Sequence, residues 1–179
     1  METHENRTGI GFAVEPIAAS LALLTLRLWL GVRSLLTGIE KFTGIDTVQK
    51  PLLDEFGEPD ISGAMVNVKE KVYGFQYYHG LPKPLYDKFA EEPLLPKWAL
   101  DLYGGVLGYG LIALGIALLL GVAPRTTLFL GGLLYVSLTL GLILIGEDGG
   151  IAWLATHVVL VVLALLLVRY SRFALWNRH

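Results

Sequence analysis

Long apolar segments dominate the chain and predict four membrane-spanning helices. A bilayer core about 30 Å thick is crossed by about 20 helical residues, and four segments reach that length. We place the spans at residues 17–42, 98–122, 126–145 and 151–170. The first span is too long for the apolar part of a cleaved signal peptide, and no small-residue cleavage site follows it. The predicted fold class is therefore all-α, an integral membrane four-helix bundle that forms a single domain over residues 1–179.

The polar stretch between the first two spans, residues 44–97, predicts a long extramembrane region. Six prolines interrupt it, and proline breaks helices because it lacks an N–H donor and clashes with the preceding turn. We therefore expect only short helices, at residues 47–56, 64–73 and 85–90. We expect the region to pack on the end of the bundle, with its aromatic side chains at the level of the lipid headgroups. Its functional interpretation is a lid over a site.

The first span carries the charges on which the site prediction rests. One helical face, with a repeat of three or four residues, is small and cationic: Arg27, Gly31, Ser34, Gly38 and Lys41. Arg33 and Glu40 are seven residues apart and share a different face. A charge at the middle of a bilayer costs roughly 2.5 to more than 10 kcal/mol. Arg27 should therefore face protein or enclosed water and have a partner.

Polar residues of the other spans complete the candidate site. Asp101 begins the second span and, in an antiparallel neighbour of the first, should lie near Lys41 or Arg33. Tyr135 lies at mid-membrane depth in the third span, and His157 is about two turns into the fourth. We expect proton exchange from Arg33, Asp101 and His157. The expected ligand-binding residues are Arg27, Glu40, Lys41 and Tyr135.

Each of these motifs also has a structural interpretation. Arg27 is alternatively a strut bonded to backbone carbonyls or to Tyr135, and the remaining charges are alternatively an ion cluster that fixes helix register. A single histidine on an apolar helix, such as His157, is more often a hydrogen-bonded core residue than a proton acceptor. The glycine pair Gly104 and Gly108 is typical of close helix packing.

Composition narrows the chemistry that this chain can supply itself. With 54% hydrophobic and 17% charged residues, the chain is typical of a helical membrane protein. The absence of cysteine excludes thiol exchange, cysteine-ligated iron–sulfur clusters and covalent haem attachment. His157 is the one histidine within the spans, so bis-histidine haem binding is not expected, and no metal-ligand spacing occurs. A net charge of -2 gives no argument for nucleic acid.

Three motifs together resemble the DoxX family of small membrane proteins, whose relatives include the DoxD subunit of thiosulfate:quinone oxidoreductase. The motifs are an arginine, small residues and a lysine in the first span (Arg27, Gly31, Gly38, Lys41), an acid before paired glycines (Asp101, Gly104, Gly105) and a Gly-x-x-x-Arg turn (Gly121 to Arg125). The resemblance covers the four spans. It implies a four-helix membrane protein attached to oxidoreductase systems, in some members handling thiosulfate or quinone.

Two features depart from the family pattern. The 44–97 region is longer than in a minimal member, and Asp101 stands where a glutamate is expected. The longer region points to a different partner or substrate, while neither departure disturbs the fold.

Two functional hypotheses follow. The first is a membrane subunit of a quinone-linked oxidoreductase system, whose polar residues bind a quinone or a small sulfur oxyanion. The alternative is a non-catalytic scaffold or anchor that docks other membrane or periplasmic subunits. A small transporter is disfavoured, because no pair of broken helices interrupts the spans. We expect a bacterial or archaeal cytoplasmic membrane. Arginines on the side of the termini nearly balance five lysines on the other side, and the short turn at Arg125 with the arginine tail favours both termini in the cytoplasm.

Overall fold

Four long helices form the body of the protein, as the sequence predicts. The computed structural model describes residues 15–52, 56–58, 60 and 62–171. The long helices are α1 (Pro16–Glu40), α3 (Lys97–Leu120), α4 (Pro124–Leu144) and α5 (Asp148–Leu167), followed by the 3₁₀ turn η2 (Val168–Tyr170). All four are long and apolar enough to cross a membrane, which confirms the four predicted spans. Their ends lie close to the predicted bounds, and the largest difference is α5, which begins at Asp148 rather than at residue 151.

Proline and glycine mark the helix ends. Pro16 and Pro124 lie in the first turn of α1 and α4, where a missing N–H donor does no harm. Gly121 ends α3 with φ 71°, a left-handed conformation that costs glycine little. The short connection from Gly121 to Pro124 makes α3 and α4 antiparallel neighbours, and Gly146 with φ 66° turns the chain between α4 and α5.

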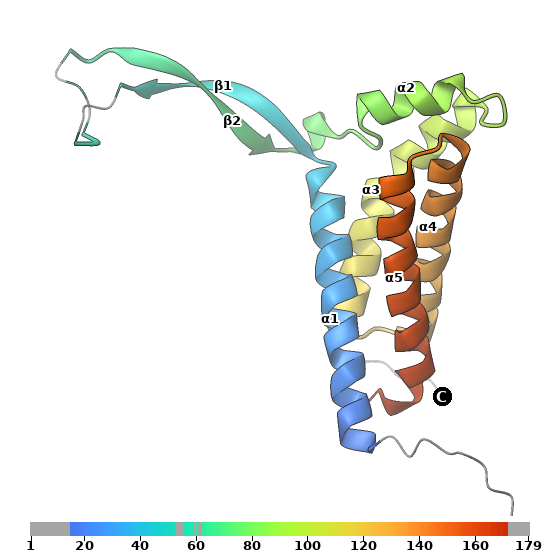
Figure 1. The fold of residues 1–179 in the computed structure, drawn as a ribbon. Helices are drawn as coiled ribbons and strands as arrows, with labels where there is room; N and C mark the ends of the chain where they lie inside the picture. Colours follow the sequence, from blue (N-terminus) through green and yellow to red (C-terminus); the bar gives the residue numbers. More distant parts are fainter. Residues whose placement is uncertain (1–14, 53–55, 59, 61, 172–179) are drawn as a thin grey trace, which may run out of the picture.

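The bundle has two distinct ends, which we call lower and upper as they appear in Figure 1. The lower end holds the start of α1, the α3–α4 turn and η2, and Ser20 Oγ lies 2.9 Å from the Tyr170 carbonyl oxygen there. The upper end holds the region between the first two spans. The arginines Arg7, Arg172 and Arg178, which support the predicted orientation, lie outside the described residues, and the orientation stays a prediction.

Small residues bring the backbones of α1 and α3 into close contact. A Cβ atom added to Gly115 would lie 2.6 Å from the Leu35 backbone nitrogen, and one added to Gly38 would lie 2.9 Å from the Ile112 backbone nitrogen. Real Cβ atoms do not approach so closely, so a larger side chain would force the two helices apart. We call this contact the α1–α3 seam. The packing interpretation of the glycines is therefore correct at these positions.

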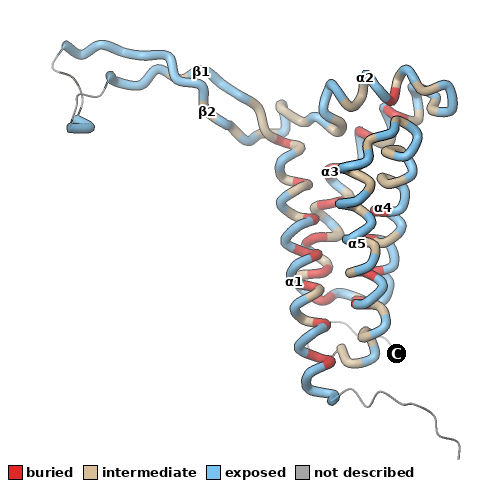
Figure 2. The backbone as a smooth tube through the Cα atoms, viewed as in Figure 1, coloured by how far each residue is buried: buried red, intermediate tan, exposed pale blue. Residues whose placement is uncertain are grey.

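Figure 2 shows that the buried residues lie along the inward faces of the helices and that the outward faces are largely exposed. The core in the lower and middle bundle is aliphatic with one tyrosine: Leu23, Leu30, Leu118, Leu128, Tyr135, Val161 and Ala164. Exposed leucine, isoleucine, valine and phenylalanine side chains cover the outside of all four helices. A surface of this kind suits contact with lipid.

The region between the first two spans differs from the prediction, because it contains a β-hairpin. Strands β1 (Thr43–Pro51) and β2 (Met65–Tyr73) pair antiparallel from Thr43↔Tyr73 to Pro51↔Met65. The predicted helices at 64–73 and, within the described residues, at 47–56 are therefore wrong, and the fold is not purely α-helical. The physical reason is β-strand propensity, since valines recur at two-residue spacing in β2 and side chains of a strand alternate between its faces.

The hairpin extends sideways from the upper end, whereas the helix α2 (Lys83–Glu91) packs on the bundle (Figure 1). This helix confirms the one predicted at residues 85–90. Phe89 is 6% exposed, and its ring lies 3.3 Å from where a Cβ atom of Gly141 would be. Lys88 Nζ lies 2.7 Å from Glu147 Oε2 at the start of α5. The expected packing of this region on the membrane end is therefore achieved by α2 and not by the hairpin.

Candidate functional site

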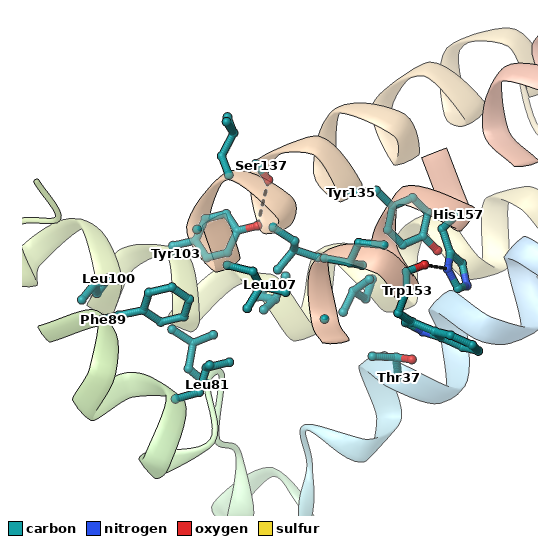
Figure 3. A pocket seen from close by; sticks show the side chains of 18 of the residues that line it. Thr37, Leu81, Phe89, Leu100, Tyr103, Leu107, Tyr135, Ser137, Trp153 and His157 are labelled. Carbon is teal, nitrogen blue, oxygen red and sulfur yellow. Dashed lines mark hydrogen bonds between the residues drawn. The ribbon is translucent and has the colours of Figure 1, made fainter. Parts of the chain in front are cut away.

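A cavity of about 540 Å³ lies in the upper half of the bundle, below α2. Side chains from all four spans and from the α2 segment line it, and Figure 3 shows 18 of these residues. Leucine is the most frequent residue of the lining, and Phe89 lies at the α2 side. Its polar and indole-bearing residues are Arg33, Ser34, Thr37, Lys41, Tyr103, Tyr135, Ser137, Trp153 and His157. We call this space the upper cavity.

A buried hydrogen bond joins α1 to α4 at one side of the upper cavity. Ser34 Oγ and the Tyr135 hydroxyl lie 3.0 Å apart, and both residues are less than 10% exposed. Ser34 belongs to the small face of α1, so the tyrosine ring can cross from α4 without a clash. The predicted ligand-binding residue Tyr135 therefore lies at the cavity, with its hydroxyl held in place.

A second hydroxyl pair joins α3 to α4. The Tyr103 hydroxyl lies 2.8 Å from Ser137 Oγ, and Ser137 Oγ donates to the Leu134 carbonyl oxygen at 2.8 Å. Because that serine proton is already used, Tyr103 is the donor to Ser137. In Figure 3 this pair lies apart from the Tyr135–His157 group, and Phe89 and Leu100 lie beyond the pair on the side away from His157.

His157 carries an unpartnered ring nitrogen. Its Nδ1 lies 2.9 Å from the Trp153 carbonyl oxygen, and because a carbonyl only accepts, Nδ1 must carry the proton. In the neutral ring Nε2 is then an acceptor. His157 is 2% exposed, and Nε2 has no hydrogen-bond partner among the residues that the structure describes. An unsatisfied buried polar atom costs about 1–3 kcal/mol, so this one calls for a functional explanation.

The ring of His157 is fixed by aromatic neighbours. The Tyr135 and Trp153 ring centroids lie 5.3 Å and 5.2 Å from that of the imidazole. These contacts leave the imidazole little freedom to turn. The proposed proton acceptor is therefore held in one orientation at the edge of the cavity.

Two cations line the cavity from α1. The Arg33 guanidinium carbon lies 5.4 Å from the Trp153 ring centroid, within cation–π range, and Arg33 is otherwise exposed. Lys41 follows the last residue of α1 and is half-buried. Burial lowers the pKa of the Lys41 ammonium, and the neighbouring Glu40 carboxylate opposes this shift. Both predicted residues, Arg33 and Lys41, therefore reach the cavity.

Arg27 does not line the cavity and has a structural partner. It is 2% exposed, and its Nε and Nη2 atoms both donate to the Leu118 carbonyl oxygen at 3.2 Å. Leu118 lies in the last turn of α3, where carbonyls lack helical partners and a cation is favourable. This geometry supports the interpretation of Arg27 as a strut bonded to a backbone carbonyl.

Asp101 and Glu40 also lie away from the cavity. Asp101 is exposed and accepts a hydrogen bond from the Tyr86 hydroxyl at 2.7 Å, rather than lying against Lys41 or Arg33 as expected. This bond raises the pKa of Tyr86, because the phenol donates to a carboxylate. The ion pairs Lys50–Glu70, Lys83–Asp87 and Lys88–Glu147 involve none of the four residues of the predicted ion cluster, which are Arg33, Glu40, Lys41 and Asp101. The reason is that the face of α3 carrying Asp101 meets α2.

Sequence reasoning missed some of the cavity residues. Thr37, Tyr103 and Trp153 were not singled out as candidates for the site. The sequence did contain a signal for Tyr103. This residue lies three or four residues from Leu100 and Leu107, so its hydroxyl belongs to the same helical face as these leucines and Leu111, a face expected to be buried. Within the described residues, no group of three histidine, cysteine, aspartate or glutamate side chains could hold a metal ion.

Comparison with known proteins identified no relative of this chain. No family model, no curated protein and no solved structure matches the chain.

Proposed function

We propose that this protein is a DoxX-like membrane subunit of a quinone-linked oxidoreductase system, and that the upper cavity binds the quinone. The observation that carries the proposal is the arrangement of polar groups. The hydroxyl pair Tyr103–Ser137 lies apart from the imidazole of His157 in a cavity whose lining is otherwise mainly apolar, with the cations Arg33 and Lys41 contributed by α1. A quinone ring has matching chemistry, since it is flat and apolar with oxygens on opposite edges.

The size and chemistry of the cavity support this ligand. Its volume of about 540 Å³ falls within the range of about 300–1,000 Å³ that is usual for small-molecule sites. The unpartnered Nε2 of His157 is a suitable acceptor for the hydroxyl of a reduced quinone. The Tyr103 and Ser137 hydroxyls offer a second polar contact, separate from the imidazole.

A bound quinone supplies two-electron, two-proton redox chemistry, and the residues of this chain bind it and exchange protons. His157 accepts a proton at Nε2, while its Nδ1–H remains on the Trp153 carbonyl and keeps the ring in position. Tyr135, held by Ser34, orients the ligand beside the imidazole. The leucine lining excludes water from the reacting oxygens. The electron partner in this proposal is a separate membrane or periplasmic subunit.

A matched pair of variants on α1 tests the cavity. Thr37→Trp places an indole into the cavity, whereas Leu36→Trp places the same group on the exposed outer face, where Leu36 is 54% exposed. The probe is decylubiquinone added to purified protein in mild detergent, with thermal unfolding as the measurement. A ligand at 100 times its dissociation constant stabilises by about 2.7 kcal/mol. We expect this stabilisation in the wild type and in Leu36→Trp but not in Thr37→Trp.

His157→Phe tests the proton acceptor separately. It keeps an aromatic ring between Tyr135 and Trp153 and removes Nε2, so we expect about tenfold weaker binding of reduced quinone, the loss of one hydrogen bond. The absence of any thermal shift in the wild type would refute a quinone site. A shift with thiosulfate that depends on Arg33 and Lys41 would instead favour the sulfur-oxyanion substrate.

The scaffold alternative is favoured by one observation. The sheet has only two strands, so β1 and β2 each keep one edge unpaired within the described residues. An unpaired edge can add a strand from another protein. Co-purification tests this alternative, because an obligate scaffold would bring a reproducible set of subunits and would not respond to quinone.

A further inference from the structure

The two faces of the β-hairpin differ in charge. Paired residues of an antiparallel ladder share a face, and successive residues alternate between faces. In the half next to the bundle, one face, which we call the lower face, consists of Thr43, Ile45, Thr47, Lys69, Lys71 and Tyr73. The opposite, upper face consists of Gly44, Asp46, Val48, Val68, Glu70 and Val72. The lower face therefore carries two lysines and no acid, whereas both acids lie on the upper face.

Contacts at the base of the hairpin show which way each face points. The upper face is covered by the 3₁₀ turn η1 (Phe75–Tyr77), because a Cβ atom on Gly44 would meet the Tyr77 ring. The Tyr77 hydroxyl also lies 3.4 Å from Asp46 Oδ2. The lower face is therefore the face opposite Tyr77.

The lower face is continuous with the lipid-facing surface of the spans. Its Tyr73 lines an apolar groove of about 620 Å³ together with Ile39 of α1 and Ile116 of α3. Ile116 is 45% exposed on the outer surface of its helix. Other residues of this groove are Phe42, Gly74, Phe75, Tyr109, Ile112 and Ala113. We call it the lateral groove, and it lies on a different face of α1 and α3 from the upper cavity.

The side chains of the lower face suit a membrane interface. Ile45 is 75% exposed and Tyr73 is 60% exposed, and the Lys71 ammonium lies 5.5 Å from the Tyr73 ring centroid. Tyrosine with lysine is a typical combination at the level of the headgroups, where the ring enters the apolar zone and the ammonium meets phosphate. The hairpin runs sideways from the upper end of the bundle, along the direction of the bilayer surface (Figure 1).

We propose that the lateral groove and the lower face form a binding site for an anionic phospholipid of the surrounding bilayer. An acyl chain lies in the groove against Ile112 and Ala113, and the phosphate lies beside Lys69 and Lys71. Two-stranded ribbons twist strongly, so the contact is confined to the half of the hairpin next to the bundle. This site is independent of the quinone proposal.

Lipid counting by native mass spectrometry tests the proposal on the full chain in detergent micelles. The probes are dioleoylphosphatidylglycerol, which is anionic, and dioleoylphosphatidylcholine, which has no net charge. We expect the wild type to prefer the anionic lipid. Each lysine near a headgroup contributes about fivefold, so K69Q combined with K71Q should reduce the preference roughly 25-fold.

Two further variants separate a site from general charge. Lys50→Gln removes a lysine that lies beyond Val48 on the same side of the hairpin as the upper face, and should leave the lipid preference unchanged. Ala113→Trp fills the groove and should reduce retention of both lipids. Equal binding of the two lipids by the wild type would overturn the proposal, as would an equal loss in Lys50→Gln. Photo-crosslinking from position 45 in native membranes should capture lipid, and capture of a protein there would overturn the lipid assignment.

Discussion

The α1–α3 seam and the upper cavity use the same helix in opposite ways. Along the seam, glycines bring backbones together so closely that a Cβ atom on Gly115 would meet the Leu35 backbone. On the same helix, Thr37 and Lys41 line a space of about 540 Å³. Small residues therefore fix α1 against α3, while the same rigid helix holds polar side chains at the edge of an open volume.

Arg27 and Arg33 show what this difference means for function. They are six residues apart on α1, yet Arg27 is buried against the Leu118 carbonyl and Arg33 lies exposed over Trp153 beside the cavity. The guanidinium of Arg27 stabilises the end of α3, whereas that of Arg33 can meet a ligand. The environment therefore assigns the two arginines different roles, and substitution can separate these roles.

The seam should be the most sensitive part of the molecule. Gly115→Leu forces α1 and α3 apart, and overpacking of this kind costs about 3 kcal/mol or more, because backbone atoms cannot move aside. We expect loss of cooperative thermal unfolding in detergent. Gly105→Leu is the matched control, since no atom lies within 4 Å of a Cβ atom added there. An equal loss of thermal stability in both variants would show that close packing at Gly115 is not what stabilises the α1–α3 contact.

The arginine pair should separate stability from ligand binding. Arg27→Leu removes the cation at the end of α3 and should lower the free energy of unfolding by about 2 kcal/mol. Its thermal response to decylubiquinone should persist. Arg33→Leu should change stability by less than about 1 kcal/mol, since it loses only an exposed cation–π contact, but should weaken the ligand response. Equal changes in stability and in ligand response for the two variants would show that Arg27 and Arg33 do not have different roles.

The smallest expected effect concerns the hydrogen bond between Tyr86 of α2 and Asp101 of α3. The hydrogen bond to Asp101 raises the pKa of Tyr86 in the folded protein, so this bond favours the neutral phenol. Its contribution to stability is present below the ordinary tyrosine pKa of about 10 and is lost as pH rises through the folded-state pKa. Absorbance titration, with Tyr86→Phe as the reference, should show this pKa moving down in Asp101→Asn. An unchanged pKa would mean that the carboxylate does not control this phenol.

The apolar spans could be predicted from the sequence because their signal is local. Twenty apolar residues in a row have few alternatives to a membrane helix, and the positions of Pro16, Gly121 and Pro124 set the helix ends. The hairpin was missed because its valines were interpreted as part of helices. Val66 and Val68 are two residues apart, a spacing that is typical of a strand and could have indicated one. Both residues pair with β1.

The candidate site was predicted only in part, because periodicity places a residue on a face without saying what that face meets. Arg33, Lys41, Tyr135 and His157 reach the cavity as expected. Asp101 does not, because α2 folds over the start of α3 and Tyr86 binds the carboxylate. That contact joins residues of two separate elements and has no signature in either.

The sequence by itself determined the four helices, their ends and the small face of α1, since helix length, capping and periodicity are properties of neighbouring residues. Only the tertiary structure decided that Arg27 stabilises a helix end, that Nε2 of His157 is left without a partner in the described chain, and that the hairpin extends from the bundle. These features depend on distances between residues far apart along the chain. Burial and hydrogen bonding across the bundle set those distances, and no local pattern encodes them.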